Sequence, residues 1–326
     1  MWISLRTVLR LVLLIGVMGI ATPGYLSAGN CKARFHRQIH FASAGAFNVL
    51  ASTGQGTDKE SPLSKDVTVF GFKIHYLEAG AGPDVVLLHG LGGDSSNWTF
   101  NINALSRSFH VIVPDQLGFG FSDKPLINYR VGTLVDFLDK FLAELKLNRV
   151  TLVGNSLGGW IAADYTIEHP DKVSRLVLVD SAGFALPKDF DMQQLSTLNP
   201  STREQMQALA GRVFYNKGLF ANKEMIDLML SRRLTAGDGF TIDKLIGSIE
   251  RSEDVLDNRL GKIKLPVLII WGKQDGLLPM SDGERFKKEI TGARLIVFDQ
   301  CGHAPMAEQA AKFNDEVIKF VSAPVH

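Results

Sequence analysis

The sequence is poor in cysteine and has almost no net charge, and both shortages exclude classes of protein. Two cysteines, Cys31 and Cys301, among 326 residues provide neither a disulfide framework nor a zinc-binding spacing. The 35 basic side chains nearly balance 34 acidic ones, and a net charge of +1 gives no indication of nucleic-acid binding. Hydrophobic residues make up 45% of the chain, as is typical of a globular protein with a substantial core.

Long hydrophobic runs are also scarce, and the one that stands out lies near the N-terminus. Residues 11–21 form an apolar run preceded by Arg6 and Arg10 and followed by small residues. This pattern is typical of a secretory signal or an uncleaved signal-anchor, although a full membrane span needs roughly 20 apolar residues. We expect residues 1–30 to export the protein to the periplasm or beyond, or to anchor it in the membrane. A buried N-terminal helix is the alternative.

Beyond this segment, short apolar runs alternate with helical stretches. Two alternating runs, 67–70 and 72–77, meet at Gly71 and predict an antiparallel pair. Almost wholly apolar runs, typical of strands buried on both faces, follow at 85–88, 111–113, 150–153, 176–179, 267–271 and 295–298. Helical patterns occupy the intervals at 133–145, 157–168, 281–289 and 308–321. This order predicts an α/β fold with a mostly parallel, doubly wound sheet.

One interval is too long to be a simple loop. More than 80 residues with helical periodicity and several Met and Phe side chains separate the run at 176–179 from the run at 267–271. We interpret this segment as a helical cap inserted after the sixth strand, over the ligand-binding edge of the sheet. The predicted divisions are a leader (1–30), a linker (31–65), a first core part (66–183), the cap (184–262) and a second core part (263–323).

A candidate nucleophile lies where the fifth predicted strand meets a helix. Ser156 is the central residue of the sequence GNSLG at 154–158. In this setting the glycines allow a tight strand-to-helix turn, which exposes the serine hydroxyl at the carboxyl end of the strand. A hydroxyl is a weak nucleophile and needs a base that is oriented by an acid. The pattern therefore predicts Ser156 as the nucleophile of a Ser-His-Asp hydrolase.

The base and the acid are expected from loops at the same edge of the sheet. His303 follows the last predicted strand and precedes the last helix, so we assign it as the base. Asp275 follows the strand at 267–271, and the order Ser156, Asp275, His303 is that of the α/β-hydrolase triad. Asp180, which follows the preceding strand, remains an alternative acid.

Two backbone N–H groups are needed to hold the oxyanion that forms during acyl transfer. One is expected from Leu157, directly after the nucleophile, and the other from Leu91 in the loop HGLGG at 89–93. His89 in that loop, and Asp115 after the next strand, are expected to fix loops by side-chain hydrogen bonds. We expect no metal and no cofactor.

Together these motifs resemble the α/β-hydrolase family over about residues 67–321. The resemblance is carried by five stretches: HGLGG at 89–93, DQLGFGFS at 115–122, GNSLGG at 154–159, VDSAGF at 179–184 and CGHAPM at 301–306. Within the family, the chain is most similar to small capped bacterial lipases and esterases and to monoacylglycerol lipases. That likeness implies hydrolysis of carboxylic or lipid esters through an acyl-enzyme, without a cofactor.

Other activities on this fold remain open. The sequence GNS-x-GG also occurs in carbon–carbon hydrolases of ring-fission products, but those proteins carry a tryptophan after the catalytic histidine, where this chain has Ala304. An acyltransferase or a ligand receptor without turnover are the further alternatives. Neither the acyl-chain length nor the oligomeric state follows from the sequence.

Overall fold

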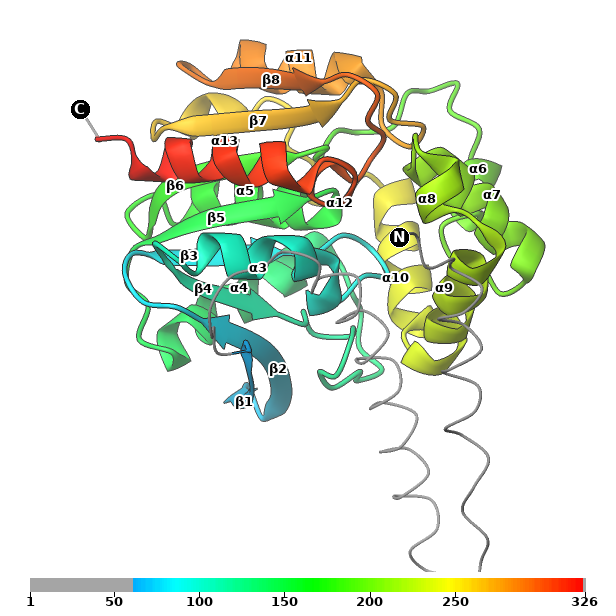
Figure 1. Cartoon of the computed structure of the whole chain (residues 1–326), viewed down its shortest axis with the longest axis horizontal. Coiled ribbons are helices and arrows are strands. Elements are labelled where there is room, and N and C mark those ends of the chain that lie inside the picture. Colours follow the sequence, from blue (N-terminus) through cyan, green and yellow to red (C-terminus); the bar gives the residue numbers. More distant parts are fainter. Residues whose placement is uncertain (1–60, 325–326) are drawn as a thin grey trace, which may run out of the picture. The chain divides into compact units, whose positions relative to one another are not determined.

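The computed structural model describes residues 61–324, so the predicted leader and nearly all of the predicted linker lie outside the described residues. In the described part, eight strands form one sheet in the order β1-β2-β4-β3-β5-β6-β7-β8 (Figure 1). The strands are β1 (Leu63–Val69), β2 (Phe72–Ala79), β3 (Asp84–Leu88), β4 (His110–Pro114), β5 (Val150–Asn155), β6 (Val173–Val179), β7 (Val267–Gly272) and β8 (Arg294–Phe298). No helix within residues 61–324 is both long and apolar enough to cross a bilayer.

The sheet is mostly parallel, which confirms the predicted fold class. The first two strands pair antiparallel with each other, and β2 pairs antiparallel with β4. From β4 through β3 and β5 to β8, all neighbouring strands are parallel. Because parallel strands share a direction, the loops after β3, β5, β6, β7 and β8 all leave from one edge.

Helices cover both faces of the sheet, so successive residues of a central strand enter different cores. On β5, Leu152 packs in the core beneath α4 (Val131–Glu144), α5 (Leu157–Glu168) and α11 (Met280–Glu289). Its neighbour Val153 packs in the opposite core, with α3 (Thr99–Leu105) and α13 (Ala310–Ser322). This two-sided burial is why the central strands are apolar at nearly every position.

The structure differs from the sequence-based predictions at three places. Strand β1 begins at Leu63, inside the predicted linker, because this edge strand is largely exposed and shows little apolar pattern. Two short helices, η1 (Ser95–Trp98) and α3, were not predicted, and α3 buries the polar residue Asn101. The last predicted helical stretch, 308–321, corresponds to α13, and a separate short helix, α12 (Pro305–Glu308), precedes it.

Between β6 and β7 lies the predicted helical cap, with η2 (Leu260–Lys262) just before β7. The arrowheads of β5 and β7 point towards the cap helices in Figure 1. These helices are α6 (Gln193–Ser196), α7 (Arg203–Val213), α8 (Lys217–Phe220), α9 (Lys223–Ala236) and α10 (Gly239–Glu250). Met206, Ala210 and Ile226 form a small core of their own, with Phe214 packed against it. Met192, by contrast, is exposed.

Candidate active site

Ser156 occupies a strained turn between β5 and α5. Its φ of +54° and ψ of −117° lie in a region that residues other than glycine rarely adopt. The turn is held by a 3.0 Å hydrogen bond from the Ser156 N–H to the carbonyl of Val179. A Cβ on Gly154 would lie 2.2 Å from the carbonyl oxygen of Gly158, so the flanking residue has to be glycine. This is the backbone of a nucleophile elbow.

His303 and Asp275 form a buried hydrogen-bonded pair on the loops that follow β8 and β7. His303 Nδ1 lies 2.7 Å from Asp275 Oδ2, and both side chains are almost fully shielded from solvent. The other oxygen of Asp275 accepts hydrogen bonds from the N–H groups of Leu277 (2.7 Å) and Leu278 (3.1 Å). Both oxygens of this carboxylate are therefore fixed, and with them the plane of the imidazole.

Asn155 joins the nucleophile turn to the histidine loop, a contact that the sequence did not reveal. Its side-chain amide donates to the carbonyl of Val179 (3.1 Å) and to the carbonyl of His303 (3.2 Å). Within residues 61–324 the imidazole is hydrogen-bonded to Asp275 and not to the hydroxyl of Ser156. Catalytic hydrogen bonds of this kind often tighten only when substrate binds.

The two predicted oxyanion donors belong to two segments that adjoin Ser156, the start of α5 and the loop after β3. Leu157 is the first residue of α5, where backbone N–H groups have no partner inside the helix. Leu91 follows Gly90 in the loop after β3, and a Cβ on Gly90 would lie only 3.2 Å from the Cβ of Ser156. The loop after β3 is therefore in contact with the nucleophile turn.

His89 holds that loop in place, as the sequence indicated. Its Nδ1 lies 2.8 Å from the carbonyl of Gly90, and its Nε2 lies 3.1 Å from the N–H of Gln116. These partners fit a neutral ring that donates from Nδ1 and accepts at Nε2. Complete burial lowers the pKa of His89 and favours the same neutral form.

Asp115, directly after β4, fixes the backbone at Ser95 and at Phe121. Its carboxylate accepts hydrogen bonds from the N–H groups of Ser95 (2.7 Å) and Phe121 (2.7 Å) and pairs with His75 Nδ1 at 2.9 Å. Burial alone would raise the pKa of Asp115, but these hydrogen bonds outweigh it and hold the pKa below its usual value. Asp115 therefore stabilises the fold as an ionised group.

Replacing Asp115 with Asn should lower the free energy of unfolding at neutral pH by about 2 kcal/mol. The reason is that the amide NH₂ of Asn would face an N–H group that now donates to a carboxylate oxygen. The folded-state pKa is below the unfolded one, so this stabilisation is present above about pH 3.9 and is lost as the pH falls through the folded value. Urea unfolding of both proteins at pH 7 and at acidic pH measures it. A difference that stays constant with pH would contradict the assignment.

On one side, the cap is hydrogen-bonded to the histidine loop. The backbone N–H of His303 donates to the carbonyl of Val213, at the end of α7, over 2.7 Å. The Glu308 carboxylate accepts from the N–H groups of Tyr215 (2.8 Å) and Asn216 (3.0 Å), which lie between α7 and α8. We call residues 213–216, together with their hydrogen bonds to His303 and Glu308, the cap joint.

On the other side, the cap contacts the loop after β3. Arg233 of α9 is buried and forms an ion pair with Asp238, which is also buried. A Cβ on Gly92 would lie 2.7 Å from Arg233 Nη1, so the guanidinium lies directly against the loop after β3. A side chain at position 92 would also be strained, since its φ is +69°. The cap thus touches the loops that carry Leu91 and His303.

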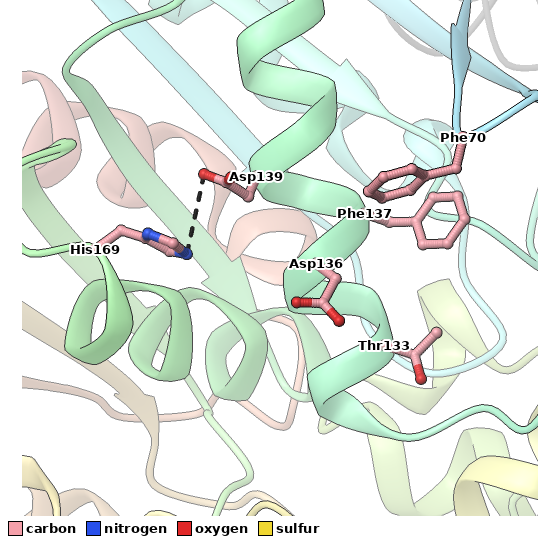
Figure 2. Close-up of a pocket in the computed structure, with 6 residues that line it drawn as sticks. All are labelled: Phe70, Thr133, Asp136, Phe137, Asp139 and His169. Carbon is pink, nitrogen blue, oxygen red and sulfur yellow. Dashed lines mark ion pairs between the residues drawn. The ribbon is translucent and has the colours of Figure 1, made fainter.

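A separate pocket of about 310 Å³ lies away from this edge (Figure 2). Its lining residues are Phe70, Thr133, Asp136, Phe137, Asp139 and His169. His169 is at the far end of α5 from Ser156, and Asp139 already pairs with Lys172 at 2.6 Å and with the hydroxyl of Tyr165 at 3.0 Å. Asp139 is therefore already paired with groups outside the pocket, and the candidate active site is the sheet edge that carries Ser156.

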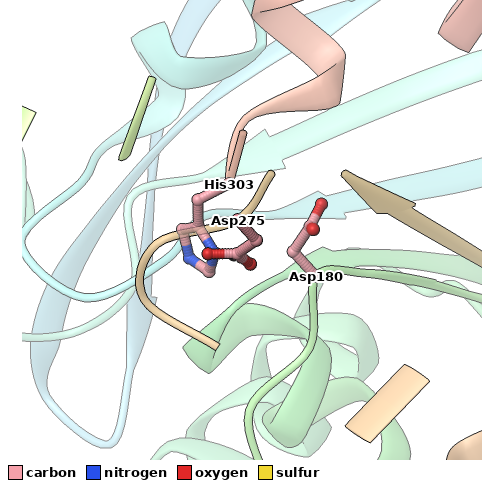
Figure 3. Close-up of side chains that lie close together, drawn as sticks. All are labelled: Asp180, Asp275 and His303. Carbon is pink, nitrogen blue, oxygen red and sulfur yellow. Dashed lines mark hydrogen bonds and ion pairs between the residues drawn. The ribbon is translucent and has the colours of Figure 1, made fainter. Parts of the chain in front are cut away.

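Asp180, the alternative acid, is also at that edge (Figure 3). It is completely buried, and its Oδ1 accepts a 2.8 Å hydrogen bond from the N–H of Gly272. Nδ1 of His303 pairs with Asp275 instead. The structure thus brings Ser156, Asp275 and His303 to one edge and leaves Asp180 beside them.

Comparison with known proteins agrees with this architecture. Residues 83–310 match the family model described as alpha/beta hydrolase fold. A 2-hydroxymuconate semialdehyde hydrolase from a Pseudomonas species is 31% identical over 268 residues, covering 80% of this chain and 94% of that protein. A bacterial membrane phospholipase A superposes with a TM-score of 0.76 at 27% identity over 97% of both chains. An esterase from Exiguobacterium antarcticum superposes with a TM-score of 0.71 at 26% identity, covering 80% of this chain and 100% of its own. The chain belongs to the α/β-hydrolase family.

Proposed function

We propose that this protein is a serine hydrolase that cleaves carboxylic esters, including acyl-lipid esters, through Ser156, His303 and Asp275. The observation that carries the proposal is the 2.7 Å pair of His303 Nδ1 and Asp275 Oδ2, on loops that meet beside the strained turn of Ser156. The likeness to an esterase and to a phospholipase A supports the same reaction class.

In the proposed mechanism, His303 acts first as base and then as acid. Because its Nδ1–H donates to Asp275, Nε2 is left as the basic nitrogen. Nε2 takes the proton of Ser156 as Oγ attacks the ester carbonyl, and then gives it to the leaving alcohol. Water repeats the sequence on the acyl-enzyme and releases the acid. Asp275 stabilises the imidazolium that forms in both halves.

The N–H groups of Leu91 and Leu157 are proposed to hold the oxyanion. Both lie beside the Ser156 turn, one in the loop after β3 and one at the start of α5. Each such donor typically contributes about 3 kcal/mol to lowering the barrier, because charge on the carbonyl oxygen grows in the transition state. No cofactor takes part in this proposal.

A second candidate is hydrolysis of a carbon–carbon bond in ring-fission products. It is favoured by the 31% identity to a 2-hydroxymuconate semialdehyde hydrolase. The residue after His303 is Ala304, where hydrolases of that kind typically carry tryptophan, and this departure favours the ester. The two reactions share a nucleophile turn and differ in the substrate that the cap admits.

A substrate panel separates these candidates. The panel contains p-nitrophenyl esters from acetate to long acyl chains and a 2-hydroxymuconate-type ring-fission product. We expect kcat/KM for at least one of the esters to exceed that for the ring-fission product by at least ~10-fold, which corresponds to about 1.4 kcal/mol of barrier. A monoacylglycerol alongside tests lipid esters, and added methanol tests acyl transfer. Faster cleavage of the ring-fission product would contradict the ester proposal, and a single turnover without steady state would indicate a receptor.

A further inference from the structure

The proposed chemistry leaves one buried ionisable group unused, Asp180. It is the first residue after β6 and is completely buried. Its φ is +40°, so the backbone is strained at the position that presents this side chain. Oδ1 accepts a hydrogen bond from Gly272, whereas Oδ2 is buried and has no hydrogen-bond partner among the groups of residues 61–324. A buried carboxyl oxygen without a partner calls for an explanation.

Asp180 lies against the pair that is proposed to activate Ser156. Carboxylate oxygens of Asp180 and Asp275 and a ring nitrogen of His303 all lie within 4.8 Å of one another (Figure 3). Both oxygens of Asp275 already have partners, since one faces His303 and the other accepts from two backbone N–H groups. An ionised carboxylate still has lone pairs for a further donor.

The surroundings of Asp180 disfavour a charge on it. Burial raises the pKa of Asp180 well above its usual value, and the nearby charges of Asp275 and Glu308 act in the same direction. The N–H of Gly272 opposes this effect. The other titratable neighbour, the thiol of Cys301, also has a raised pKa, chiefly through burial. Two negative charges this close in a buried site repel each other, and Asp275 is the one of the two carboxyls with hydrogen-bond partners at both oxygens.

We propose that Asp180 is a positioning residue: it is protonated, and its Oδ2–H donates a hydrogen bond to the carboxylate of Asp275, which holds that carboxylate against His303. The inference rests on the proposed function of His303 and Asp275. It assigns Asp180 a role in orienting the acid, in place of the alternative in which Asp180 itself pairs with the histidine.

Isosteric replacement of Asp180 tests the charge state. Asp180→Asn substitutes a neutral group for a neutral group, and its amide donates to Asp275 while its carbonyl accepts from Gly272. We expect kcat/KM for a p-nitrophenyl ester to stay within about threefold, and the acidic limb of the pH profile to keep its midpoint within about 0.3 pH unit. If Asp180 were ionised, the substitution would remove a negative charge near His303 and move that limb to lower pH by more than about 0.5 unit.

Removing the donor tests the positioning role. Asp180→Ala should lower kcat by about 10- to 100-fold with KM little changed, because a hydrogen bond to a charged group is lost. Labelling of Ser156 with a fluorophosphonate counts the folded, active fraction, so that instability of the variant is separated from slower chemistry. In Asp275→Asn, kcat should fall by about 10⁴-fold even with Asp180 intact, because an amide at position 275 favours the wrong tautomer of His303.

The outcomes distinguish this inference from the proposed function. A wild-type protein that hydrolyses no ester overturns the function itself. An active wild type with a shifted pH limb in Asp180→Asn, or with full activity in Asp180→Ala, overturns the role of Asp180 alone. Substantial activity in Asp275→Asn would remove Asp275 from the proposed mechanism and the role of Asp180 with it. Wild-type activity that falls with EDTA and returns with a divalent cation would assign Asp180, Asp275 and His303 to a metal site instead.

Discussion

Ser156→Ala should lower kcat/KM for p-nitrophenyl esters by about 10⁶-fold, leaving only the contribution of binding and of the oxyanion donors. The expected loss is this large because the proposed acyl-enzyme has no other route of formation once Oγ is gone. Initial rates on purified wild-type and variant protein measure it. Intact-mass analysis after treatment with a fluorophosphonate should show one adduct on the wild type, on the peptide that contains Ser156, and none on the variant.

The serine variant has a matched control in the cap. Ser231 is an exposed residue of α9, so Ser231→Ala should leave both the rate and the labelling unchanged. Thermal unfolding of Ser156→Ala should coincide with that of the wild type, because the hydroxyl of Ser156 supports no packing that alanine would lose. A Ser156→Ala protein with a tenth of the wild-type activity, or labelling at another serine, would remove Ser156 as nucleophile.

Gly158→Ala should destabilise the fold by at least about 3 kcal/mol and abolish activity in the protein that remains folded. Gly158 is the second residue of α5, and a Cβ there would lie 2.3 Å from the carbonyl oxygen of Leu88 and 2.6 Å from that of His89. Both obstacles are backbone atoms, at the end of β3 and in the loop that follows it. The added methyl group therefore has to push α5 away from the sheet or displace the loop that carries Leu91.

The control for this substitution is a glycine in an open helical position. Gly211 lies in α7, and apart from its chain neighbours and the backbone of its own helix, no heavy atom of residues 61–324 lies within 4 Å of the position of its Cβ. Gly211→Ala should therefore stabilise the protein by about 0.5–1 kcal/mol through helix propensity. Urea unfolding of the two variants, together with ester hydrolysis, provides the comparison. If Gly158→Ala were as stable as Gly211→Ala, the close approach of α5 to β3 would be wrong.

The central strands could be predicted from the sequence because a strand buried on both faces is apolar at nearly every position. Leu152 and Val153 face opposite cores, so both have to be apolar. Strand β1 lies at the edge of the sheet and is mostly exposed, so its start at Leu63 left no such pattern. Helix α3 was missed because Asn101, which looks like a surface residue, is buried and bonded to Asn314 at 2.8 Å.

The candidate site was predictable where residues follow strands, and unpredictable where the role depends on a distant partner. Ser156, Asp275 and His303 each come after an apolar run, and parallel topology alone brings such positions to one edge. Nothing near Asn155 in the sequence indicates that its amide reaches the carbonyl of His303, 148 positions away. The same holds for Arg233, whose contact with Gly92 depends on how the cap folds back over the sheet.

The cap joint limits how this enzyme can acquire new substrates. Because residues 213–216 supply the acceptor for the His303 N–H and two donors to Glu308, the cap is not an exchangeable module. A cap transplanted from a relative whose backbone did not reproduce this joint would leave the N–H of the buried His303 unpaired at the proposed base, at a cost of about 1–3 kcal/mol. Divergence of specificity, in evolution or in the laboratory, is therefore expected to proceed through substitutions along α9 and α10, with this joint kept intact.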